Sequence, residues 1–238
     1  MRTQLLVLSL AAAALGCAST NVTSQSVTLG QAPKPELVVV KNFATSPEDV
    51  SLDHSPTAVA AWKLQGVTAS SERREVGHQV ADALADNLVK DIQKLGLPAE
   101  RASGPLPEDG VKRVVIDGQF LAINEGSRLE RVSIGLGAGK SEVRTAVQTV
   151  EILPYGSRLL DTFEITAKSG DKPGMAETMG VGAAAGDLAV SAAVSAAGAV
   201  ASEEFGTDVD ADARRTADKI SKVLASYFES QGWIVPGN

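Results

Sequence analysis

Residues 141–170, with the sequence SEVRTAVQTVEILPYGSRLLDTFEITAKSG, decide the fold of this chain. The runs 141–153 and 158–170 are dense in Val, Thr and other strand-forming residues, which indicates two β-strands. The spacer LPYGS between them, residues 153–157, is typical of a hairpin turn. Because strands joined by so short a turn pair antiparallel, this stretch predicts an antiparallel sheet.

Further elements are predicted on both sides of this hairpin. Residues 37–43 (LVVVKNF) and 112–126 (KRVVIDGQFLAINEG) have the composition of two more strands. Residues 70–98 carry an apolar stripe at helical spacing and then reach Gly96, which predicts an amphipathic helix. Residues 211–232 predict a second one. The predicted stripes consist of Val76, Val80, Leu84, Leu88, Ile92 and Leu95 in the first helix and Ala213, Ala217, Ile220, Leu224 and Phe228 in the second.

The order strand, helix, three strands, helix predicts an α+β fold. We expect a two-layer sandwich in which two amphipathic helices cover a mainly antiparallel sheet of about four strands. A Gly/Ala-rich helical insertion accompanies this domain. The expected division is a signal peptide at 1–16, a lipidated tether at 17–36, the α+β domain at 37–178, the Gly/Ala-rich segment at 179–204 and a C-terminal helix packed on the domain at 205–238.

The N-terminus has the features of a secretory signal peptide. One positive charge precedes the apolar run 5–16, which is too short to span a membrane. Residues 14–17 (ALGC) resemble a bacterial lipobox, although the commonest form has Leu at position 14 and a smaller residue at 15. Cys17 is the only cysteine, and lipidation explains an unpaired cysteine in an exported protein. The alternative is that Cys17 is removed with an ordinary signal peptide.

Lipidation of Cys17 also predicts a location. Ala18, rather than an aspartate, follows the cysteine, and by the sorting rule known for bacterial lipoproteins this favours the outer membrane. We therefore expect a protein anchored at the periplasmic face of the outer membrane, with a soluble periplasmic protein as the alternative. Residues 18–36 are rich in Ser, Thr, Gln and Pro and predict a flexible tether.

The composition disfavours binding to nucleic acid. The net charge is −7, and aromatic residues make up only 4% of the chain. An acidic chain repels phosphate backbones, and no basic patch is interleaved with aromatic side chains.

Residues 179–201 consist almost entirely of Gly, Ala, Ser and Val. Gly182 and Gly186 bound a GAAAG pattern of the kind that lets helices approach closely. One interpretation is a helical hairpin that self-associates into a homo-oligomer or touches the bilayer. The others are an Ala-rich helix packed on the domain and a mobile insertion. Asp187 counts against a membrane span.

No motif predicts catalysis, a cofactor or a metal. The stretch SIGLGAGKSE, residues 133–142, resembles a phosphate-binding loop, but that loop requires a glycine at position 134, where Ile stands. The following segment is also strand-like, whereas a phosphate-binding loop opens a helix. We therefore expect no nucleotide. Asp208, Asp210 and Asp212 begin like a calcium-binding loop, but the Gly and Glu that such a loop requires later are absent.

The stretch GSRLERVSIGLGAGKSEVRTAVQTVE, residues 126–151, resembles the signature of the DUF4410 family of bacterial, mostly lipoprotein, sequences. The family pattern has an Arg, a G-x-G-x-G-x-S run and a Val-rich strand. Here Arg128 or Arg131 takes the place of the Arg, and the run corresponds to Gly135, Gly137, Gly139 and Ser141. The resemblance covers about residues 36–200 and implies a compartment and an architecture but no reaction. We interpret the three glycines as a structural bend or a protein-docking groove.

These observations predict a non-enzymatic outer-membrane lipoprotein whose periplasmic domain binds protein partners in the cell envelope. One alternative is a self-associating structural, pore or secretion accessory component that uses the Gly/Ala-rich segment. A second alternative is an envelope hydrolase.

Overall fold

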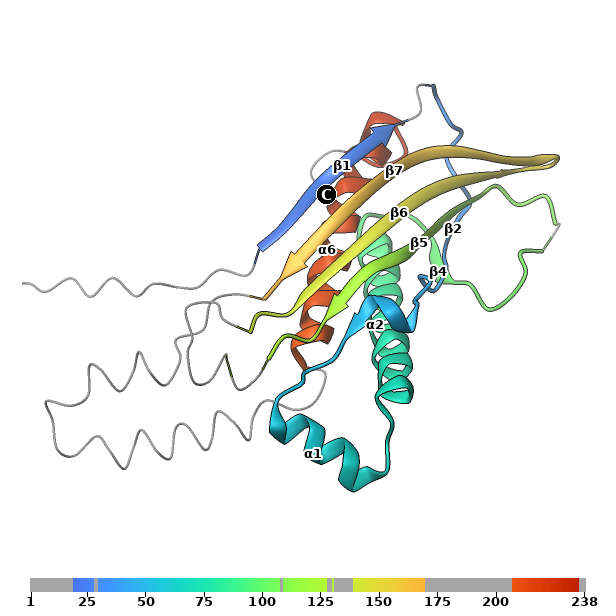
Figure 1. Cartoon of the computed structure of the whole chain (residues 1–238). Coiled ribbons are helices and arrows are strands. Elements are labelled where there is room, and N and C mark those ends of the chain that lie inside the picture. Colours follow the sequence, from blue (N-terminus) through green and yellow to red (C-terminus); the bar gives the residue numbers. More distant parts are fainter. Residues whose placement is uncertain are drawn as a thin grey trace, which may run out of the picture.

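A computed structural model describes residues 19–27, 30–107, 109–127, 130, 139–169 and 207–235, without the side chains of 207–210. A seven-stranded sheet has the order β1-β7-β6-β5-β2-β4, with β3 paired to β5 (Figure 1). The strands are β1 (Ser19–Val27), β2 (Leu37–Val40), β3 (Val50–Ser51), β4 (Ala99–Arg101), β5 (Arg113–Asn124), β6 (Glu142–Leu153) and β7 (Gly156–Lys168). The helices are η1 (Pro47–Asp49), α1 (Pro56–Gln65), α2 (Ala69–Lys94) and α6 (Thr207–Ser230).

The predicted hairpin is confirmed. β6 and β7 pair antiparallel from Glu142 opposite Lys168 to Leu153 opposite Gly156. Along β6, buried side chains alternate with more exposed ones, and Val143 lies on the buried face. This period of two matches the pleat of a strand with one face in the core and the other toward solvent.

The α+β class is confirmed, but the expectation of about four mainly antiparallel strands is wrong. The sheet has seven strands and is mixed. β2 pairs in parallel with both β4 and β5. This parallel pairing follows from the path of the chain, because α1 and α2 lie between β2 and β4 and return the chain to the same end of the sheet.

The structure also differs from the tether predicted at 17–36. Within this range Ser19–Val27 forms β1, which pairs antiparallel with β7 and has a bulge between Val22 and Ser24. The composition of this segment resembles that of a linker for a physical reason. An edge strand exposes most of its side chains, so Ser, Thr, Asn and Gln suit it as well as they suit a linker.

Ala32 is a second point at which this N-terminal segment is fixed. Its N–H donates to Gln231 Oε1 at 2.7 Å, and its carbonyl accepts from Trp233 Nε1 at 2.9 Å. Ala32 is buried. The chain after β1 is therefore bound to the C-terminal end of α6.

α2 and α6 pack together and cover one face of the sheet (Figure 1). Both predicted apolar stripes lie in the core. The buried residues of the two stripes are Val76, Val80, Leu84, Leu88 and Ile92 from α2 and Ala213, Ala217, Ile220, Leu224 and Phe228 from α6. α2 begins at a capping box between Thr68 and Ser71, which satisfies two otherwise free N–H groups. Within the described residues, no helix combines the length and the apolar character that crossing a membrane requires.

Replacement of Leu88 by Ala tests the packing of α2. Leu88 is fully buried, so the loss of its side chain should lower the free energy of unfolding by about 2–5 kcal/mol. Leu64→Ala is the matched control, because Leu64 is 89% exposed and its change should stay within about 0.5 kcal/mol. Urea denaturation followed by circular dichroism measures both. Equal losses in the two variants would contradict the observed packing.

Candidate functional site

One end of the sheet gathers most of the features that the sequence singles out. Asn124, Glu142, Lys168 and Ser19 form a row of register partners across β5, β6, β7 and β1. Lys168 Nζ pairs with Glu142 Oε2 at 2.9 Å in this row. We call this end the loop end. The glycine stretch between β5 and β6, the segment between β7 and α6, and the connection from Cys17 to β1 all attach here.

Three buried polar residues close the loop end against α6. The Ser141 hydroxyl donates to Asp212 Oδ2, while Arg215 pairs with the other carboxylate oxygen, Oδ1. The Ser141 N–H donates to Ser169 Oγ at 3.0 Å, and the Ser169 N–H donates to the Ser141 carbonyl at 3.1 Å. We call Ser141, Ser169 and Asp212 the Ser141 clasp.

The Ser141 clasp is structural in character. Ser141 and Asp212 are fully buried, and Ser169 is nearly so. A hydroxyl that donates to a buried carboxylate and has no histidine bonded to it is not arranged as a nucleophile. The clasp instead joins the start of β6, the end of β7 and the first turns of α6.

The base of the glycine stretch is closed by direct backbone contact. The Ser127 N–H donates to the carbonyl of Gly139 at 3.0 Å. Gly126 has φ +71°, and a Cβ atom there would collide with the Gly139 carbonyl oxygen and lie 2.6 Å from the carbonyl carbon of Lys140. Only glycine fits this position without displacing backbone. Gly126 stands at the start of the same motif in the sequence. The prediction nevertheless gives the structural role only to the later glycines.

The structure describes one of the predicted site glycines, Gly139, which has φ 68° and lies in the closed base of the stretch. The remaining predicted site residues, Cys17, Gly135, Gly137, Gly182 and Gly186, lie outside the described residues. Their predicted roles stay predictions.

Two buried carboxylates near the loop end were not predicted. Glu125 Oε2 accepts from the Asp53 N–H at 3.0 Å, and Asp53 Oδ1 accepts from the Ser55 N–H at 2.8 Å. Ser55 in turn caps α1 by accepting from the Ala58 N–H. These bonds connect the end of β5 to the start of α1.

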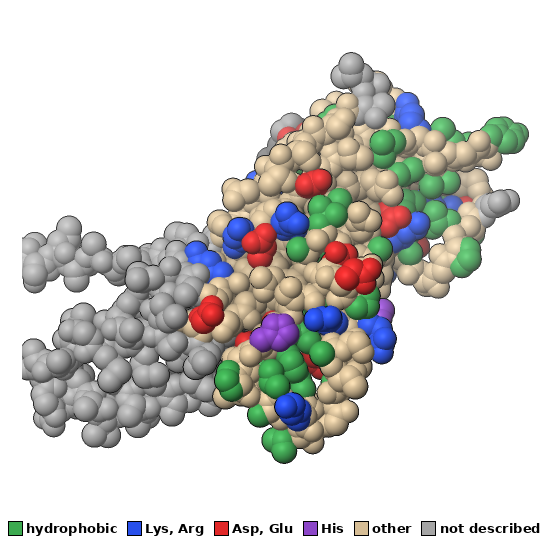
Figure 2. Space-filling model, viewed as in Figure 1, with side chains coloured by type: hydrophobic (Ala, Val, Ile, Leu, Met, Phe, Trp, Pro, Cys, Tyr) green, Lys and Arg blue, Asp and Glu red, His purple; other side chains and the backbone are tan. Residues whose placement is uncertain are grey.

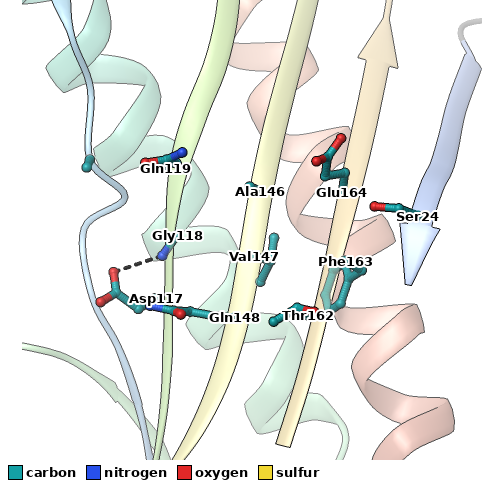
Figure 3. A pocket seen from close by; sticks show the side chains of 11 residues that line it. Ser24, Asp117, Gly118, Gln119, Ala146, Val147, Gln148, Thr162, Phe163 and Glu164 are labelled. Atoms are coloured by element: carbon teal, nitrogen blue, oxygen red, sulfur yellow. Dashed lines mark hydrogen bonds between the residues drawn. The ribbon is translucent and has the colours of Figure 1, made fainter. Parts of the chain in front are cut away.

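The face of the sheet opposite the helices carries an open hollow of about 540 Å³. Figure 3 shows it across β5, β6, β7 and β1, with the helices behind the sheet. Its polar side chains are Ser24, Asp117, Gln119, Gln148, Thr162 and Glu164. Gly118 forms part of its floor, where a Cβ atom would lie 2.7 Å from Phe43 Cε2. The hollow therefore offers hydrogen-bonding groups on a broad surface.

The end of the sheet opposite the loop end is the β6–β7 hairpin, which exposes three large hydrophobic side chains. Leu153 and Leu159 are partly exposed and Tyr155 is fully exposed. Figure 2 shows hydrophobic side chains gathered at this end of the molecule. We call it the hairpin end.

A cluster of charged side chains joins β4 to α2. Arg101 of β4 pairs with Asp86 at 2.8 Å and with Asp82 at 2.6 Å, both on α2. The hydrogen bond from Arg101 lowers the pKa of Asp82. In the part of the chain that the structure describes, no group of three or more His, Cys, Asp or Glu side chains could hold a metal ion.

Comparison with known proteins gives a family and a distant resemblance. The family model described as "Domain of unknown function (DUF4410)" matches residues 38–186. No curated protein matches. A dodecamer of a PelC point variant from Paraburkholderia phytofirmans is 16% identical, with 64% of this chain and 81% of that chain covered and a TM-score of 0.30. The PelC dodecamer from the same organism is 15% identical, with the same coverage and TM-score. At this TM-score the likeness supports no conclusion about the present chain.

Replacement of Gly126 by Ala tests the closure of the glycine stretch. The new Cβ would meet the backbone of Gly139 and Lys140, so the free energy of unfolding should fall by about 3 kcal/mol or more. Gly110→Ala is the matched control, because Gly110 has φ +78° with nothing within 4 Å of its Cβ position. It should lose only about 1–2 kcal/mol from backbone strain. Thermal unfolding compares the two, and equal losses would refute the close contact.

Proposed function

The chain belongs to the DUF4410 family, and from this premise we propose that it is a non-enzymatic outer-membrane lipoprotein. In this proposal a lipid on Cys17 anchors the domain, and the periplasmic domain binds protein partners in the cell envelope. The family description assigns no activity. The support therefore comes from the geometry of the domain.

The observation that carries the proposal is the place where β1 begins. Ser19 is two positions after Cys17 and lies in the row of residues that marks the loop end. Two residues span at most about 7 Å. An acyl chain on Cys17 would therefore hold the loop end against the membrane surface, in contrast to a long tether that lets the domain hang freely.

This orientation leaves the hairpin end and the open face of the sheet available to partners. β7 has 13 residues, which at roughly 3.3 Å per residue extend the hairpin end about 40 Å from the loop end. The apolar side chains there and the polar hollow on the open face are both typical components of a protein interface. The buried, bonded Ser141 gives no comparable support to hydrolysis.

One observation favours the self-associating alternative. The segment between β7 and α6 contains the Gly/Ala-rich residues 179–204, and both of its flanks lie at the loop end. Ser169 and Asp212, on either side of the segment, both bond to Ser141. An anchor on Cys17 would bring this segment close to the bilayer and to the same segment of neighbouring copies.

The anchor is tested by replacing Cys17 with Ser. The unaltered protein should carry acyl mass and sediment with the outer membrane, and the variant should lose both, because serine cannot form the thioether. Intact mass spectrometry and membrane fractionation measure the two properties. A plain mass and a soluble periplasmic fraction for the unaltered protein would reject the lipoprotein proposal.

The partner surface is tested by placing a photo-crosslinking residue at Gln148 in the hollow. The matched control is Gln79, an exposed glutamine on α2, on the helical side of the sheet. Illumination of intact cells should give discrete adducts from Gln148 and none from Gln79. An adduct with a second copy of the chain would favour self-association, and no adduct from Gln148 would exclude the open face as the docking surface.

A further inference from the structure

β1 is an edge strand of the sheet with little apolar burial. It pairs with β7 alone, and seven of its nine side chains are exposed. Val22 of β1 packs against the hydrophobic core. Elements with few buried apolar contacts open at lower free energy than the rest of a domain. Ala32, which is fixed to Gln231 and Trp233, provides a pivot at which such an opening would stop.

A buried carboxylate lies beneath β1. Asp161 of β7 is fully buried and is the register partner of Val27 at the end of β1. Its Oδ2 accepts from Gln25 Nε2 of β1 at 3.3 Å. Its Oδ1 has no hydrogen-bond partner. Detaching β1 would remove the Gln25 bond and open the carboxylate to water.

Two hydroxyl groups near Asp161 could pair with its protonated form. Thr149, its register partner on β6, and Tyr227 on α6 both have buried hydroxyl groups without a partner. Either hydroxyl oxygen could accept a hydrogen bond from a protonated carboxyl group. For the ionised form, Gln25 of β1 is the side-chain donor that the structure shows.

The charged groups in this region do not neutralise Asp161. Arg158 of β7 is engaged with Glu151 of β6, at 2.6 Å. β1 has no ionisable residue. Tyr227 is the ionisable group that α6 contributes, and its pKa is raised. Burial is the largest cause; Asp161 and Glu151 also raise this pKa, and Arg158 opposes them. Burial raises the pKa of Asp161 to about 6, against smaller opposing effects of Gln25 and the Thr162 amide.

We propose that Asp161 is a proton-controlled latch for β1, which holds the strand on the sheet when its carboxyl group is protonated and loosens the strand when it ionises. The direction of the pH effect follows from the linkage between proton binding to Asp161 and docking of β1. Because the pKa of Asp161 is higher with β1 docked than in water, docking takes up a proton. The docked state is thus favoured below about pH 6 and weakens as the pH rises from about 4 to about 6.

The latch would change the distance between the domain and the membrane, and this consequence rests on the proposed anchor at Cys17. With β1 docked, one residue separates Cys17 from the sheet. With β1 released, the chain from 18 to 31 becomes the connection, up to the fixed Ala32. Fourteen residues can extend about 45–50 Å, so a released β1 would let the domain move away from the bilayer.

The test is hydrogen exchange of the β1 amides in the full chain in detergent, at about pH 5 and about pH 7.5, corrected for the intrinsic pH dependence of exchange. For the unaltered protein we expect β1 protection to be about tenfold higher at the lower pH. Asp161→Asn removes the titration, so its β1 protection should be equal at both pH values. Glu164→Gln is the matched control on the same strand, and its exposed side chain should leave the tenfold difference intact.

A second variant tests the latch without replacing a buried residue. Gln25→Ala changes only the edge strand and removes the donor to the ionised form, so it should lower β1 protection mainly at about pH 7.5. Equal β1 protection at both pH values in the unaltered protein, or an undiminished pH effect in Asp161→Asn, would overturn the latch. These amides report on β1 whether or not Cys17 is acylated. A flat profile therefore rejects the latch alone, and a missing acyl group rejects the anchor alone.

Discussion

Pairing between β6 and β7 runs the full length of both strands, and the other elements take their positions from it. β5 and β1 add to its two sides, and α2 and α6 pack on the face that carries Val143, Val147 and Phe163. The same register aligns the strand ends into the row that marks the loop end. The hairpin therefore determines both the core and the place where the long connections leave the domain.

Elements with a local pattern could be predicted from the sequence, and elements defined by distant partners could not. The stripe of α2, the stripe of α6 and the alternation of β6 each repeat within a single segment, so periodicity reveals them. The parallel pairing of β2 with β4 and β5 depends on segments far apart in the chain. β1 was missed because nothing in an exposed, uncharged strand distinguishes it from a linker until its neighbour is known.

The candidate site shows the same division. The glycine stretch is visible as a motif, but the bond from Ser141 to Asp212 joins residues separated by 71 positions, and no spacing rule connects them. The contact of Gly126 with Gly139 and Lys140 likewise depends on where the stretch returns. The glycine motif is thus visible in the sequence. Only the fold shows that the hydroxyl group of Ser141, at the end of this motif, is bonded to Asp212.

An anchor at the start of β1 would also determine how the domain resists being pulled from the membrane. Force from Cys17 would enter β1 at Ser19, the strand end nearest the anchor. In an antiparallel pair the hydrogen bonds lie perpendicular to the strands, so a load along β1 would fall on all of them together. A load perpendicular to the strand would instead break them one after another. An edge strand with little apolar burial could therefore carry a lipid anchor, provided that the load acts along the strand.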